Sequence, residues 1–145
     1  MATNLVYKND NKKNRVEDLG ETLAPGVPVV SASGAPAVTV NGSADYTVSE
    51  VIPGVGTLSG IPAGGIGLSG QEVTLAFDGT WEFLASSFAG TAPNPATIAQ
   101  GTAVYITADN ELTLTEGSNT VFGSVDVPKD YDRTRGFVPV KIGNR

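Results

Sequence analysis

Apolar residues recur at every second position in short runs, and Gly or Pro interrupts most of these runs. In residues 71–77, Val73, Leu75 and Phe77 alternate with smaller or polar side chains. A period of two places successive side chains on opposite faces of an extended strand, whereas a helix needs a period near 3.6. The pattern therefore predicts an all-β domain, either a small β-barrel or a β-sandwich.

The expected strands are short and closely spaced. They lie at residues 4–7, 27–31, 37–40, 46–52, 71–77, 80–84, 103–107, 111–115, 121–127 and 137–142. In the ninth of these, we expect Val121, Val125 and Val127 to share one face. Pro139 has no N–H to donate to a sheet, so we expect the last strand to lie at an edge or to have that side free.

Turn signals divide these strands. Asp78-Gly79 predicts either a hairpin or a glycine bulge within one bent strand. Residues 41–70 are rich in Gly and Pro and are interpreted as a loop region or an insertion, with either a loop or a pair of kinked strands in 53–70. One short helical turn is expected near residues 95–100, because Asn94 is a suitable N-cap and Pro95 suits the first helical position.

Several kinds of chemistry lack their usual residues. The chain has no Cys and no His, which excludes disulfides, thiolate metal sites and a His-activated nucleophile. Residues 65–70 match G-x-G-x-x-G, but the next segment is an expected strand and not the helix that phosphate binding requires. The carboxylates of 126–132 lack the Gly and Glu positions of a calcium loop. We therefore predict no enzymatic activity, no catalytic residues, no metal and no cofactor.

Charge is segregated along the chain. The net charge is −6, yet all nine basic residues lie in 1–15 and 129–145, and twelve carboxylates occupy 16–128. A nucleic-acid-binding protein needs a broad basic face, which this body lacks. No stretch of the sequence resembles a secretory signal or a membrane span. We expect neither nucleic acid nor a membrane as partner, and we expect docking through the two basic ends.

The sequence divides into an extended basic N-terminal arm, residues 1–20, and a single β-rich domain, residues 21–145. Fifteen extended residues reach up to ~50 Å, enough to contact a neighbouring molecule. The candidate binding residues of the arm are Asn4, Tyr7, Lys8, Lys12, Lys13 and Arg15. The candidate interface residues elsewhere are Trp81, Lys129, Arg133 and Arg135. For Trp81 two interpretations stay open, a core anchor or a hot spot facing a partner.

The order of several segments resembles a known family. Residues 72–83 (EVTLAFDGTWEF) are similar to an alternating E-V-T-V-A strand followed by a glycine, and residues 98–106 (IAQGTAVYI) to an I-A-x-G-x-x-V-Y segment. Residues 119–125 (NTVFGSV) resemble a G-N-T strand, and 137–142 (FVPVKI) stand where a V-R-V-x-L strand ends the family pattern. The family is the capsid cement, or head-decoration, proteins of tailed bacteriophages.

This resemblance implies a small β-rich protein, often a homotrimer, that binds the outer surface of the capsid after synthesis in the host cytoplasm. It would clamp neighbouring major capsid proteins, with the arm facing the capsid and the second residue group at a subunit or capsid interface. The alternative is a tail-fibre, baseplate or cell-surface carbohydrate-binding β-module. That class predicts an exposed aromatic platform and a polar cleft.

Overall fold

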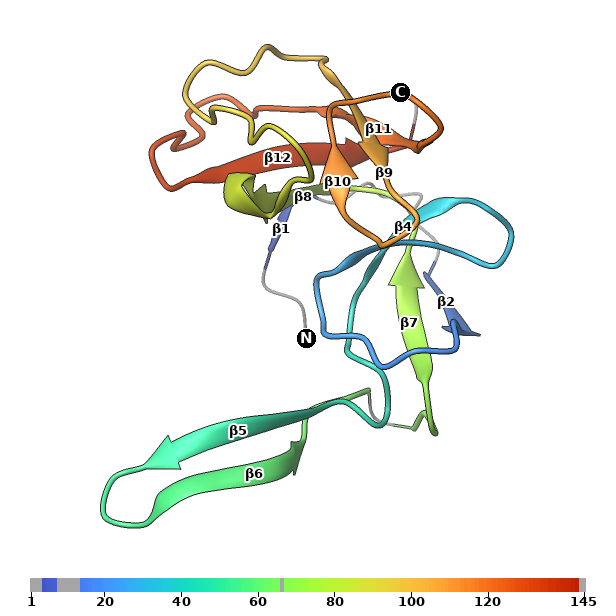
Figure 1. The fold of residues 1–145 in the computed structure, drawn as a ribbon, viewed down its shortest axis with the longest axis vertical. Helices are drawn as coiled ribbons and strands as arrows, with labels where there is room; N and C mark the ends of the chain where they lie inside the picture. Colours follow the sequence, from blue (N-terminus) through green and yellow to red (C-terminus); the bar gives the residue numbers. More distant parts are fainter. Residues whose placement is uncertain (1–3, 8–13, 66, 144–145) are drawn as a thin grey trace.

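The computed structural model describes residues 4–7, 14–65 and 67–143, and these are nearly all β (Figure 1). This confirms the predicted fold class. The strands are β1 Leu5–Tyr7, β2 Asn14–Asp18, β3 Pro28–Val30, β4 Pro36–Thr39, β5 Thr47–Ile52, β6 Gly56–Pro62, β7 Glu72–Ala76, β8 Thr80–Leu84, β9 Ala103–Ile106, β10 Leu112–Thr113, β11 Thr120–Val125 and β12 Phe137–Ile142. One 3₁₀ turn, η1 Ala85–Ser87, follows β8.

The larger sheet has the strand order β1-β8-β12-β11-β9-β10 and curls as a half-barrel. The last strand, β12, is central in it, so the expected edge position is wrong. The other expectation, that the side of β12 at Pro139 is free of a strand partner, explains how an interior strand tolerates proline. The carbonyl of Pro139 accepts the N–H of Asp126, which lies one residue beyond the end of β11. The position where Pro139 lacks an N–H therefore faces no residue of a strand.

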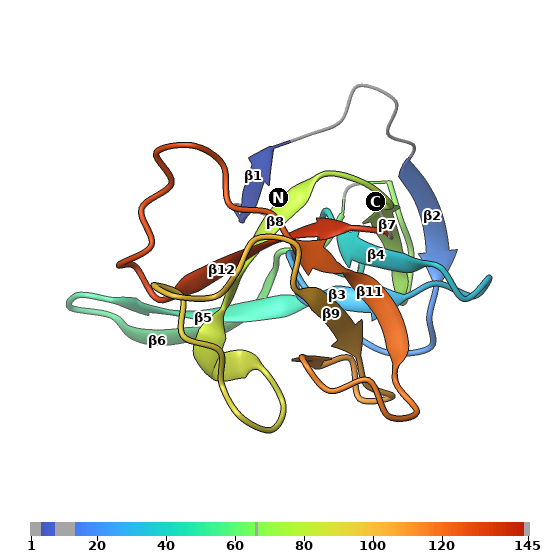
Figure 2. The same cartoon turned by 90° about the horizontal axis from the view of Figure 1, so that it is seen from above.

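The smaller sheet has the order β2-β7-β4-β3. Strands β7 and β8 follow each other along the chain but belong to different sheets (Figure 2), so Asp78-Gly79 is a bend and not a hairpin. Gly79 has a φ of 95°, a conformation that strongly favours glycine. The indole N–H of Trp81 donates to the carbonyl of Asp78 at 2.9 Å and fastens the bend.

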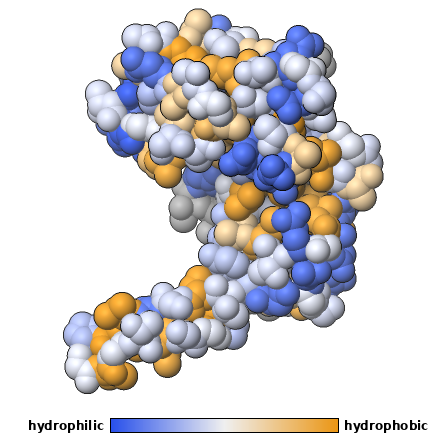
Figure 3. All heavy atoms as spheres, in the orientation of Figure 1, coloured by the Kyte–Doolittle hydropathy of each residue, from blue (hydrophilic) through white to orange (hydrophobic). Residues whose placement is uncertain are grey.

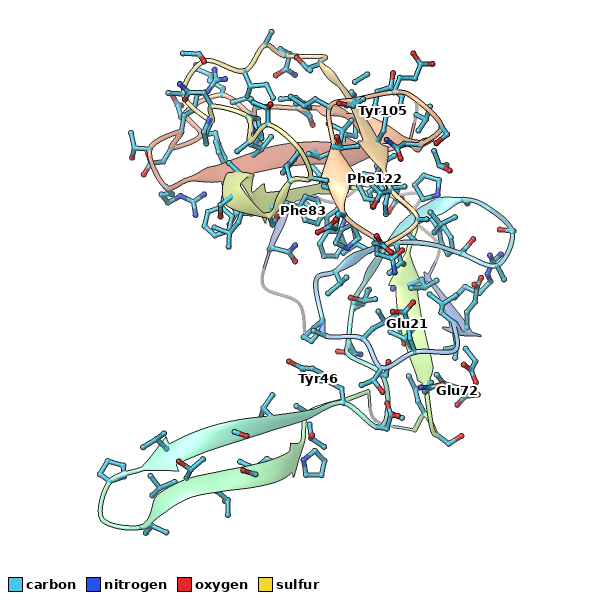
Figure 4. All side chains as sticks on the ribbon, in the orientation of Figure 1. Glu21, Tyr46, Glu72, Phe83, Tyr105 and Phe122 are labelled. Atoms are coloured by element: carbon cyan, nitrogen blue, oxygen red, sulfur yellow. The ribbon has the colours of Figure 1, made fainter. Side chains whose placement is uncertain are left out.

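The segment interpreted as a loop or insertion contains a two-stranded sheet, β5–β6, that projects from the body (Figure 1). At its base, near Tyr46 (Figure 4), a parallel bridge joins Gly42 to Gly64. A Cβ atom on Gly64 would lie 1.8 Å from the carbonyl oxygen of Ser43, so only glycine permits this approach. The base is therefore fixed by close backbone packing.

Two clusters of buried side chains form the core. The larger joins strands β8, β9, β11 and β12 to Val38 and Ala76 of the smaller sheet. Phe83 and Phe122 meet edge to face within it, with ring centroids 6.0 Å apart and an interplanar angle of 82° (Figure 4). Trp81 belongs to the same cluster and is 2% exposed, which favours the core-anchor interpretation.

Two local expectations differ in detail from the structure. Val121, expected to share a face with Val125, is exposed, because the register of β11 against β9 shifts between Val121 and Gly123 and turns Phe122 inward.

The helical turn near residues 95–100 is a single hydrogen-bonded turn. Asn94 caps it by accepting the N–H of Ala96 on its side chain and that of Ile98 on its carbonyl.

The core geometry predicts a sharp contrast between adjacent positions of β11. Phe122→Ala removes a fully buried ring and its partner contact with Phe83, so the free energy of unfolding falls by about 3–5 kcal/mol. Val121→Ala, on the exposed face, changes it by less than about 0.5 kcal/mol. Denaturant unfolding of both variants checks this, and equal losses would contradict the assigned register.

Candidate interaction surfaces

The N-terminal segment is anchored at both of its described ends. Strand β1 pairs with β8 in the larger sheet, and β2 pairs with β7 in the smaller one. Asn4 reinforces the first anchor by donating from Nδ2 to the carbonyls of Gly26 and Glu82, each at 3.1 Å. Pairing with its own body shortens the ~50 Å reach that a free arm would have.

Three of the six candidate arm residues lie in the sequence between these two anchors. Lys8, Lys12 and Lys13 fall outside the described residues, and Tyr7 is placed only by its backbone in β1. The neighbouring strand β2 was not expected, because residues 9–15 are polar and offer nothing to bury. It forms by backbone pairing with β7, which needs no apolar side chains.

Arg15 is engaged with its own chain. Its guanidinium forms an ion pair with Glu17 at 2.6 Å and lies 4.8 Å from the centre of the Phe77 ring. The side chain is still 53% exposed. Arg15 can therefore contribute charge to a binding surface without leaving its partners.

The charged loop between β11 and β12 holds neighbouring loops in place. Arg133 donates to the carbonyl of Pro95 at 2.9 Å and also to that of Ile98, so it stabilises the capped turn. Lys129 is exposed. Of the three basic residues predicted for an interface in this loop, Arg133 thus has a clear role within the fold.

Arg135, the third of them, belongs to a cluster around Glu82. The Glu82 carboxylate accepts from Arg135 and from the hydroxyl of Tyr131, both at 2.7 Å. The guanidinium of Arg135 also lies 5.2 Å from the Tyr131 ring and 5.5 Å from the Phe137 ring. Tyr131 and Arg135 of the loop thus bind Glu82 of β8, and these contacts fasten the loop to the larger sheet.

Ionisation in this cluster follows from its geometry. Burial acts to raise the pKa of Glu82, but hydrogen bonds from Arg135 and Tyr131 outweigh it and hold that pKa below its ordinary value of 4.5. Burial, and then the hydrogen bond to the Glu82 carboxylate, raise the pKa of Tyr131 well above its usual range. At neutral pH the cluster is a carboxylate, a guanidinium and a neutral phenol.

Two apolar surfaces were not recognised in the sequence. The first is the tip of the β5–β6 hairpin, where Val51 and Val55 are 75% and 77% exposed and Leu58 is 49% exposed (Figure 3). The second is a groove of about 330 Å³, bordered by the 25–28 loop and by Leu84. The signal for the first was available, because Val51-Ile52-Pro53-Gly54-Val55 is an apolar stretch without any charge.

The described residues contain no group of three or more Asp, Glu, His or Cys side chains that could hold a metal ion. The glycines of 65–70 lead into strand β7 and not into a helix, as expected. Within the same described ranges, no helix has the length and apolar character to cross a membrane.

These features define a small all-β module whose buried aromatics serve its core and whose described arginines, Arg15, Arg133 and Arg135, contact other parts of the same chain. The family model described as phage cement protein matches residues 31–142. The chain therefore belongs to the phage cement protein family, which confirms the resemblance and gives the chain a structural, capsid-associated role in the virion. Comparison with curated proteins and with solved structures found no match.

The Glu82 cluster predicts a pH-dependent contribution to stability. Because the pKa of Glu82 is lower in the folded chain than in the unfolded one, its contribution is complete above pH 4.5 and is lost as the pH falls through the folded value. Glu82→Gln should lower the free energy of unfolding by about 1 kcal/mol at about pH 7 and by much less at about pH 3.

Denaturant unfolding at both pH values measures this difference. Glu116→Gln, a change to an exposed loop carboxylate, is the matched control and should have little effect at either pH. A loss for Glu82→Gln that is equally large at both pH values would contradict the assigned charge on Glu82.

Proposed function

We propose that this protein binds the outer surface of a phage capsid and stabilises it by clamping neighbouring major capsid proteins. Membership of the cement family supports a capsid-associated role. Residues 1–20 would provide the capsid contact and residues 21–145 the decoration domain. A homotrimer, as the resemblance implies, would repeat this contact around a symmetry axis and raise the avidity of the complex.

One observation carries the assignment of the capsid-facing side. Lys8, Lys12 and Lys13 lie in the sequence between β1 and β2, and these two strands belong to different sheets. Arg15 lies in β2, and its side chain is 53% exposed. Four basic residues thus belong to one short stretch of a molecule whose central part, 16–128, has no basic residue. A complementary acidic capsid surface would bind this stretch and steer the approach.

Clamping follows from binding thermodynamics. A ligand that binds only the assembled capsid stabilises it over the separated subunits, by an amount that grows with the logarithm of its concentration above Kd. A protein that spans the junction between two capsid subunits has this property, because the complete site exists only when both subunits are in place. Lys129, exposed on the 128–136 loop, would add a second basic contact at such a junction.

The basic stretch can be tested by neutralising it. Replacement of Lys8, Lys12 and Lys13 together by Gln should weaken cosedimentation with purified undecorated capsids by roughly tenfold or more, since each exposed charge pair contributes up to about 1 kcal/mol. Raising the salt concentration should weaken wild-type binding in the same direction. Deletion is a poorer test, because it also removes β1 from its pairing with β8.

Glu116→Gln, a charge change that follows β10 at the opposite edge of the larger sheet from β1, is the control and should retain full binding. Undiminished capsid binding by the triple variant at physiological salt would refute the assignment of the basic stretch. Binding to glycans without any binding to capsids would instead favour a carbohydrate-binding module.

Clamping itself has a separate test. Capsids saturated with the protein should be disrupted at a higher temperature than bare capsids, and the shift should increase with the concentration of free protein. Light scattering or release of the packaged DNA follows the disruption. Binding without any shift would mean decoration without stabilisation.

A further inference from the structure

A cavity of about 360 Å³ is bordered by two loops of the larger sheet and by strand β3 of the smaller one. The loops are 107–111, between β9 and β10, and 116–119, which leads into β11. The described lining residues include two amides and three hydroxyls, and none of them is charged or aromatic. Ligand pockets have volumes of roughly 300–1,000 Å³, so this cavity suits a small ligand.

The apolar part of the cavity comes from both sheets. Ile106 of β9 and Thr120 of β11 are directly opposite each other in the strand pairing, so their side chains lie on the same face of the larger sheet. Val30 of β3 borders the cavity from the smaller sheet. An apolar surface beside hydroxyl groups complements a ligand that carries both C–H and O–H groups.

Each of the two amide side chains is oriented by its own nitrogen atom. Nδ2 of Asn110 donates to the carboxylate of Glu21 at 3.4 Å, and Nδ2 of Asn119 donates to the carbonyl of Thr115 at 3.0 Å. Within the described chain, neither Oδ1 atom accepts a hydrogen bond. Each Oδ1 is therefore an oriented acceptor whose lone pairs are available to a ligand.

The three hydroxyls add donors. The Oγ1 atom of Thr107 accepts the backbone N–H groups of Asp109 and Glu111, each at 3.2 Å, which leaves its own proton to be donated. The hydroxyls of Ser118 and Thr120 form no hydrogen bond with any described residue, so each can both donate and accept. The cavity thus offers donors and acceptors without a net charge.

Charge and ring content exclude several other classes of ligand. The two loops carry exposed carboxylates at Asp109, Glu111 and Glu116, and residues 16–128 include no basic residue to neutralise them. The two ion pairs of the described ranges involve Glu17 and Glu82 instead. An anionic ligand would be repelled, a cationic one would find no charged group in the lining, and a nucleobase would find no aromatic ring on which to stack. A neutral polyhydroxyl ligand remains.

The cavity and the N-terminal strands lie toward opposite edges of both sheets. In the larger sheet, β9 and β10 end the strand order that β1 begins, and in the smaller sheet β3 ends the order that β2 begins. Strand β9 also lies on the opposite side of the body from β1 (Figure 2). A protein bound to a capsid through its N-terminal segment would therefore keep this cavity accessible.

We propose that this cavity binds a neutral saccharide, either a free sugar ring or the terminal unit of a glycan. The two amide oxygens would accept hydrogen bonds from sugar hydroxyls, and the three hydroxyls of the lining would donate to sugar oxygens. The C–H face of the ring would lie against Val30 and Ile106. The proposal goes beyond capsid attachment and holds whether or not the protein clamps a capsid.

Sugar binding is measured by NMR, from the amide signals of the isotope-labelled full chain during titration with glucose, galactose or mannose. At least one of these sugars should shift the signals of 106–111 and 118–120 in a saturable manner. The matching uronates carry a carboxylate and should bind at least roughly threefold more weakly, because the carboxylates of the two loops repel them. No saturable shift with any of the three neutral sugars, or equal binding of the uronates, would overturn the proposal.

Variants that each remove one ligand contact locate the site. Thr120→Val replaces a hydroxyl by a methyl group of similar shape and should weaken binding by roughly twofold to tenfold. Asn110→Gly removes an acceptor at a backbone φ of 62°, which glycine adopts readily, and should have an effect of similar size. Thr57→Val, on the β5–β6 hairpin, is the matched control and should retain full affinity. Each variant is first shown to retain the wild-type unfolding transition, and wild-type affinity in both cavity variants would contradict the assigned site.

Capsid cosedimentation separates this inference from the proposed function. The double variant Ser118→Ala, Thr120→Val should bind undecorated capsids as wild type does, and the triple lysine variant should bind sugar as wild type does. Loss of capsid binding in the double variant would identify the cavity as a capsid contact and overturn the saccharide site. Loss of capsid binding in the lysine variant, with sugar binding intact, would support two independent sites.

Discussion

The bend at Phe77–Gly79 is the constraint on which the rest of the structure depends. It lets one nearly continuous stretch of chain serve as β7 in the smaller sheet and β8 in the larger one. Gly79 permits the change of direction, and its carbonyl accepts the N–H of Ile142 from the last strand. Because β1 pairs with β8 and β2 pairs with β7, the bend also sets the relative positions of these two N-terminal strands.

The distribution of charge has a structural side as well as a functional one. Within the described ranges, Arg15 and Arg135 form the two ion pairs, and Arg133 donates to loop carbonyls. The arginines thus stabilise the chain that bears them, as their planar, multiply donating head groups suit. Among the described lysines, Lys129 is exposed on the 128–136 loop, where a partner can reach it.

The sequence was sufficient to predict where most strands lie, but it did not show which strands pair with each other. Alternation predicted most of the strands, because burial of one face selects a period of two. It could not predict β2, which is polar and forms through backbone pairing, or the shift at Val121–Gly123, which reverses the face that a valine occupies. Among the candidate site residues, Arg133 and Arg135 could not be assigned to loop fastening, because their acceptors lie 35 to 53 positions away in the sequence. The hairpin tip was visible as an uncharged apolar stretch, but its exposure is a property of the fold.

The double anchoring of the N-terminal segment changes what binding requires of it. A tail held at one end explores a large volume, and ordering it on a partner has a large entropic penalty. Here β1 and β2 pair with different sheets, so the positions of both strands that flank the lysines in the sequence are set when the chain folds, and part of that entropy is lost before binding. After a proteolytic cut between the two strands, β2 would stay joined to the body by the chain itself, and the piece that carries β1 would depend on its pairing with β8. The two anchors therefore differ in what a break in the chain would do to them, since one depends on hydrogen bonds alone and the other on the covalent chain as well.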